Sequence, residues 1–121
     1  MIKRPLSMHE VGIMQSAMEI VIERARSAGA RQVSRIALRI GALSGVEPEA
    51  LRFAFDVVTR GTMAEGATLE INAVPARARC TPCSLDYDVT GGFIFICPQC
   101  GGFSGHLLQG RELELSRIEM N

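Results

Sequence analysis

Two closely spaced cysteine pairs, Cys80 with Cys83 and Cys97 with Cys100, constrain the fold of this chain more than any other feature. Each pair has the spacing C-x2-C, which lets both sulfur atoms of one tight turn reach a single metal ion. Four thiolates complete the tetrahedral coordination of Zn(II) and leave no open position for water or substrate. We therefore predict one structural zinc ion bound by these four cysteines.

Other uses of four cysteines fit the sequence less well. Two disulfides need an oxidising compartment, and a thioredoxin-type redox pair needs one pair between a strand and a helix. An iron–sulfur cluster also uses four thiolates, but two symmetric paired motifs favour zinc. The residues between the pairs, 84–89 and 91–96, predict a hairpin with a glycine turn. The segment 77–109 is therefore expected to be a zinc-ribbon-like lobe whose folding energy comes from the ion.

Charge and hydropathy exclude several classes of partner. Lys plus Arg equals Asp plus Glu, at 13 each, and the chain has no basic block. Binding to a nucleic-acid backbone needs clustered positive charge, so we expect no nucleic-acid partner. No apolar run is long enough to span a membrane, and the N-terminal residues lack the apolar segment of a signal peptide. These features predict a cytoplasmic protein without a membrane partner.

Hydrophobic periodicity predicts two helices. The first is expected to begin near Ser7, where Ser7-x-x-Glu10 has capping-box spacing, and to end at Gly29. Its apolar stripe consists of Met14, Ala17, Met18, Val21, Ile22, Ala25 and Ala28. The second is expected to open at Glu47-Pro48-Glu49 and to end at Gly61. Its stripe consists of Leu51, Ala54, Phe55 and Val58.

Alternating or apolar segments at 33–40, at 68–74 and after Gly110 predict three strands. The last strand follows the zinc lobe, which is too small to bury it, so it is expected to return to the first sheet. The predicted fold is α+β, with two helices on a three-stranded sheet and an inserted zinc-ribbon-like lobe. The first lobe is then 1–76 completed by 110–121, and the zinc lobe is 77–109. Terminal strands with long crossings also allow a homodimer formed by domain swapping.

From Met8 onward the sequence resembles the HypA/HybF family of hydrogenase maturation nickel metallochaperones. The resemblance rests on several short motifs in addition to the cysteine pairs. They are Met8-His9-Glu10 before a helix, Ile36 to Gly41 leading into Leu43-Ser44-Gly45-Val46, Pro48 at the second helix, Gln109-Gly110, and Glu112-Leu113-Glu114-Leu115.

The resemblance implies a non-enzymatic carrier of Ni(II) with a structural zinc lobe. His9 would be the principal nickel ligand, with Glu10 and Met8 beside it. The chain would work with the nickel-insertion GTPase HypB and deliver the metal to the precursor of the nickel–iron hydrogenase large subunit. A recipient such as urease is an alternative. An imidazole nitrogen with amide and amine nitrogens gives the nitrogen-rich square-planar set that suits Ni(II).

Four questions remain open at this stage. Family members begin at the Met, whose α-amine can bind metal, whereas seven residues precede Met8 here. The Met-His-Glu segment is also compatible with a simple helix cap. His106 is either an additional ligand or a strand-edge residue, and the chain as a whole is either a nickel carrier or a zinc-ribbon module that binds protein or nucleic acid.

Overall fold

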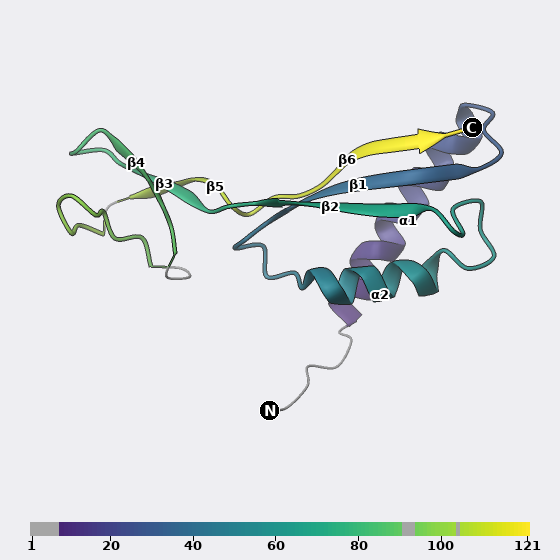
Figure 1. The fold of residues 1–121 in the computed structure, drawn as a ribbon, viewed down its shortest axis with the longest axis horizontal. Helices are drawn as coiled ribbons and strands as arrows, with labels where there is room; N and C mark the ends of the chain where they lie inside the picture. The colour runs from purple at the N-terminus through teal and green to yellow at the C-terminus, as the bar shows by residue number, and fades with distance from the viewer. Residues whose placement is uncertain (1–7, 91–93, 104) are drawn as a thin grey trace. The chain divides into compact units, whose positions relative to one another are not determined.

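The fold is described from a computed structural model, in which residues 8–90, 94–103 and 105–121 are placed (Figure 1). The described residues form two helices and two three-stranded sheets, with strand orders β2-β1-β6 and β4-β3-β5. The elements are α1 (Met8–Ser27), β1 (Val33–Gly41), α2 (Pro48–Val58), β2 (Thr68–Val74), β3 (Arg77–Cys80), β4 (Leu85–Asp88), β5 (His106–Gln109) and β6 (Leu113–Met120). The predicted α+β fold with an inserted second sheet is confirmed, because the final strand returns to the first sheet.

The chain divides into two compact units. The first contains the described residues up to Leu38, together with Val46–Ile71 and Leu115–Asn121. The second contains Arg39–Gly45 and the described residues of Asn72–Glu114. The division of the sequence into lobes 1–76 with 110–121, and 77–109, stays a prediction.

The core of the first unit is formed by the apolar stripes of both helices against the sheet. On α1, the buried members of the predicted stripe are Met14, Met18, Val21 and Ala25. On α2 they are Leu51, Ala54 and Phe55, and on β1 the buried apolar residues include Val33, Ile36 and Leu38. Helical residues three and four apart share one face, so the spacing seen in the sequence puts these side chains on the side that is buried.

Local hydrogen bonds cap the C-terminal end of α1 and the N-terminal end of α2. At the end of α1, Gly29 has a φ of 71°, its N–H donates to the carbonyl of Arg26, and the N–H of Ala30 donates to the carbonyl of Ala25. This is a Schellman motif, which glycine adopts without strain. The α2 helix begins at Pro48, and the Glu47 side chain accepts a hydrogen bond from the Glu49 N–H. The predicted Ser7 cap lies outside the described residues.

The second unit is built around β3, which pairs antiparallel with β4 on one side and with β5 on the other. Arg77 and Arg79 on β3 form ion pairs with Asp88 and Asp86 on β4. The predicted hairpin between the two cysteine pairs is wrong in its pairing. The strand β4 pairs with β3 rather than with residues 94–96, which are not in a strand, and residues 91–93 lie outside the described part.

Candidate metal sites

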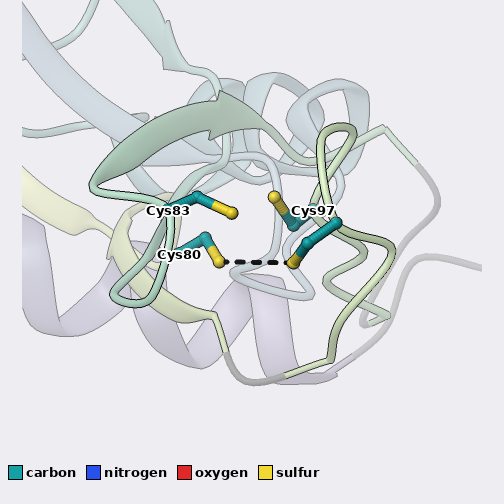
Figure 2. A group of neighbouring side chains, drawn as sticks. Cys80, Cys83 and Cys97 are labelled. Carbon is teal, nitrogen blue, oxygen red and sulfur yellow. Dashed lines mark hydrogen bonds between the residues drawn. The ribbon is translucent and has the colours of Figure 1, made fainter.

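The four cysteine sulfurs converge on one point in the second unit (Figure 2). All four Sγ atoms lie within 4.8 Å of one another, and Sγ of Cys80 is 3.7 Å from Sγ of Cys100. A tetrahedral ion with metal–sulfur bonds of about 2.3 Å requires sulfur–sulfur separations of about 3.8 Å. A disulfide would require about 2.05 Å. The arrangement therefore fits one tetrahedral ion and excludes a disulfide between Cys80 and Cys100 in this structure.

Two similar turns hold the sulfurs in place. In the second turn, the N–H of Gly101 donates to the carbonyl of Cys97, and Gly101 has a φ of 71°. In the first turn, Ser84 occupies the equivalent place after Cys83, has a φ of 51°, and its N–H donates to the carbonyl of Thr81. Both C-x2-C segments thus close through a residue in the left-handed region. Ser84 is the only residue other than glycine in the described chain with a positive φ.

The thiols of the cluster differ in their pKa values. Backbone N–H donation from Cys100, with a further contribution from Gln99, lowers the pKa of Cys97 to about 7. A side-chain hydrogen bond with Cys100, followed by burial, raises the pKa of Cys83 to about 12. The backbone N–H of Cys83 lowers the pKa of Cys80, but burial and the thiols of Cys97 and Cys100 together raise it above its usual value. A central cation is the natural way to hold four sulfurs this close as thiolates.

The cysteines make up much of a small core in the second unit. Cys80 and Cys97 are buried together with Ala78 and Tyr87. The hydroxyl of Tyr87 is buried without a hydrogen-bond partner among the described residues, and a Cβ at Gly105 would overlap it. The contact between Tyr87 and Gly105 could not be predicted from the sequence, because neither the strand pattern nor the turn chemistry indicates that this ring crosses β3 to reach the start of β5.

The Met-His-Glu segment lies in the first turn of α1 rather than before the helix, because α1 begins at Met8. The His9 side chain is 60% exposed, whereas that of Glu10 is fully buried. Oε2 of Glu10 lies 3.7 Å from Nδ1 of His9 and accepts a hydrogen bond of 3.4 Å from the backbone nitrogen of Glu47. The sequence carries no signal for this link, since Glu10 and Glu47 are far apart in the chain and neither belongs to a shared pattern.

Among the described residues, the remaining candidates do not belong to the cysteine cluster. His106 lies on β5, exposed and opposite Arg79 in the β3–β5 ladder. Among the described residues, the four cysteines form the only cluster of three or more histidine, cysteine or acidic side chains that could hold a metal. Met14 and Met18 are buried in the core, which agrees with their helical spacing. Within the described residues, no helix combines the length and hydropathy needed to cross a membrane.

Comparison with known proteins gives a consistent result along nearly the whole chain. A family model described as "Hydrogenase/urease nickel incorporation, metallochaperone, hypA" matches residues 8–120. The hydrogenase maturation factor HypA of Acidithiobacillus ferrooxidans is 48% identical over 113 residues, which are 93% of this chain and 99% of that protein. The protein of the same description from Geobacter metallireducens is 43% identical over 113 residues, with the same coverage of 93% and 99%.

Two solved structures share the fold. The solution structure of the Ni metallochaperone HypA from Helicobacter pylori has a TM-score of 0.61 and 21% identity, and the match covers 92% of this chain and 96% of that one. A second solution structure, of HypA protein, has a TM-score of 0.70 and 24% identity, with coverage of 95% and 98%. At these identities the likeness concerns the fold.

Proposed function

Because the chain belongs to the HypA family of hydrogenase and urease nickel-incorporation proteins, we propose that it is a nickel metallochaperone for the maturation of nickel–iron hydrogenase. The observation that carries the proposal is the family match over residues 8–120, which begins at Met8 and includes both cysteine pairs. The chain binds Ni(II) as cargo in the cytoplasm and performs no catalytic step itself. It works with the nickel-insertion GTPase HypB and delivers the metal to the hydrogenase large-subunit precursor.

His9 is the principal nickel ligand in this proposal. Its exposed imidazole is open to an incoming ion, and the buried Glu10 carboxylate lies on its Nδ1 side. A carboxylate in that position orients the ring and leaves Nε2 for the metal. The carboxylate is held in turn by the Glu47 N–H. Glu10 therefore completes the site mainly by positioning His9.

Backbone nitrogens near Met8 complete the donor set. The first N–H groups of a helix have no partner within the helix, so those of His9 and Glu10 are available for deprotonation and metal binding. The positive end of the helix dipole opposes a cation at the same place. A site that combines suitable nitrogen donors with this opposing field holds nickel loosely enough to pass it on.

Zinc is the resident metal of the cysteine site. Four soft thiolates in a tetrahedral arrangement select Zn(II) over nickel, which prefers square-planar nitrogen ligands. The bound ion supplies structural stability and no catalysis, because all four positions are taken by Cys80, Cys83, Cys97 and Cys100. We assign 77–109 as the zinc-binding lobe and 1–76, completed by 110–121, as the nickel-binding lobe.

The function is tested by metal loading and transfer. Purified protein should hold one zinc ion that resists a weak chelator and should bind one further Ni(II), which moves to an isolated hydrogenase large-subunit precursor when HypB and GTP are present. A Met8-start version should bind nickel more tightly, since its α-amine is free. Binding of an oligonucleotide at physiological salt without uptake of nickel would instead indicate a zinc-ribbon module.

A further inference from the structure

The four thiolates of the cysteine site differ in the backbone hydrogen bonds that they accept, and from this difference we infer a modification site. We propose that Cys83 is the sulfur at which small, soft alkylating electrophiles attack the metal-loaded protein. The inference rests on the proposed function in one respect, namely that the four cysteines hold zinc.

Cys83 and Cys100 differ in the backbone N–H groups that reach their sulfurs. The N–H of Gly102 donates to Sγ of Cys100 at 3.4 Å. Within the described ranges, Sγ of Cys83 accepts no backbone N–H.

The sequence after each pair explains the asymmetry. Gly102 follows Cys100 by two positions, lies outside any strand, and turns its N–H toward the sulfur. The equivalent residue after Cys83 is Leu85, which is the first residue of β4 and lies opposite Cys80 in the ladder with β3. Leu85 is therefore held by the sheet rather than by the metal turn.

Solvent exposure leaves Cys83 and Cys100 as the two cysteines that an electrophile can reach. Cys80 and Cys97 are buried, whereas Cys83 is half-buried and Cys100 is exposed. Exposure alone predicts that Cys100 reacts first, and hydrogen bonding predicts Cys83. The two criteria therefore give opposite results, which makes the proposal testable.

Hydrogen bonding should decide the outcome because zinc keeps all four sulfurs deprotonated. When the thiolate fraction is equal, reactivity follows the electron density on sulfur, and each N–H donor lowers it. The rate changes by about threefold for each unit of thiol basicity. In the reaction with iodoacetamide, a lone pair on Cys83 Sγ forms the S–C bond while the C–I bond breaks and iodide leaves. The product is a thioether, so the ion loses one thiolate donor.

The experiment treats zinc-loaded full-length protein with less than one equivalent of iodoacetamide and locates the label by peptide mass spectrometry. We expect several-fold more label on Cys83 than on Cys100, with zinc released to a chromogenic chelator as the label accumulates. Equal labelling, or a first label on Cys100, Cys80 or Cys97, would overturn the proposal.

A pair of variants at one position separates hydrogen bonding from exposure. Gly102→Pro removes the N–H that donates to Cys100 while leaving the sulfur exposed, and Gly102→Ala keeps the N–H. We expect labelling of Cys100 to rise about threefold in the proline variant relative to the alanine variant. Equal Cys100 labelling in two zinc-loaded variants would also contradict the proposal.

Native mass spectrometry of the starting protein distinguishes a failure of the proposed zinc site from a failure of the inference about Cys83. A protein that binds no zinc at the cysteines contradicts the proposed structural site. A protein that carries zinc but reacts first at a sulfur other than Cys83 contradicts the present inference alone. If Gly102→Pro fails to load zinc, the labelling order of the unmodified chain still decides the question.

Discussion

Oε2 of Glu10 lies 3.7 Å from Nδ1 of His9, although the Glu10 side chain is fully buried and the His9 side chain is 60% exposed. Neighbouring residues in the first turn of α1 thus lie in opposite environments, one in the protein interior and one in solvent. The buried carboxylate is fixed by the backbone N–H of Glu47, just before α2 begins. The exposed imidazole faces solvent beside it, as the proposed role of His9 as a nickel ligand requires.

Substitutions of Glu10 should separate its charge from its hydrogen bond. Glu10→Gln keeps an acceptor for the Glu47 N–H but removes the charge beside His9, so nickel affinity should fall about 10–100-fold while the fold is retained. Glu10→Ala also leaves the Glu47 N–H without this acceptor, which should lower the free energy of unfolding by about 1–3 kcal/mol. Nickel titration and chemical denaturation of both variants check these outcomes. Unchanged nickel affinity in Glu10→Gln would contradict the positioning role.

Loss of one zinc ligand should unfold the second unit selectively. Cys97 is buried in a small core formed with Cys80, Ala78 and Tyr87. Cys97→Ser, or removal of the ion by a strong chelator, should therefore abolish amide exchange protection in β3, β4 and β5, because binding energy is folding energy for such a lobe. Protection in α1 and α2 should remain largely intact. Exchange mass spectrometry with and without zinc makes the comparison, and full protection of β3–β5 in the metal-free protein would contradict it.

Ser84 offers a stabilising substitution. Its φ of 51° is in the left-handed region, whereas the equivalent residue of the other cysteine turn is Gly101, with a φ of 71°. A non-glycine residue in this conformation costs roughly 1–2 kcal/mol. Ser84→Gly should therefore raise the free energy of unfolding of the zinc-loaded protein by about 1 kcal/mol. Thermal unfolding of the wild type, Ser84→Gly and Ser84→Ala measures the effect, and a lower stability of the glycine variant would contradict it.

Two glycine-to-alanine substitutions should change the free energy of unfolding in opposite directions. A Cβ at Gly41 would overlap the carbonyl group of Gly110, which is backbone and cannot rotate away. Gly41→Ala should therefore destabilise the protein by about 1–3 kcal/mol. At Gly12, within α1, a Cβ meets nothing within 4 Å. Gly12→Ala should stabilise the helix by about 1 kcal/mol. Denaturant midpoints compare the two, and a neutral Gly41→Ala would show that the backbone shifts without cost.

The helices and the main strands could be predicted because their signals are local. The apolar residues Met14, Met18 and Val21 follow the helical repeat. Pro48 marks the start of α2 and Gly29 marks the end of α1, so residues at each boundary indicate where the helix begins or ends. The C-x2-C spacing likewise brings two sulfurs together within one turn. The return of β6 to the first sheet followed from a simple requirement, namely that an apolar strand needs a surface on which to be buried.

Three other features that join distant residues could not be predicted. The pairing of β4 with β3 rather than with the segment before Cys97 depends on competition between two possible partners, and the glycine turn suggested the wrong one. The link from Glu10 to the Glu47 N–H depends on how α1 and α2 cross, which no short pattern encodes. The burial of Tyr87 against Gly105 has the same origin.

The central claim is that His9 holds nickel while the cysteines hold zinc. Calorimetric titration of zinc-loaded protein with Ni(II) tests it most directly, with His106→Ala as the matched control, because His106 is the only other histidine and is also exposed. One nickel site should appear in the wild type and in His106→Ala, and it should be lost in His9→Ala while the zinc content stays at one ion per chain. An unchanged nickel isotherm in His9→Ala would contradict the account.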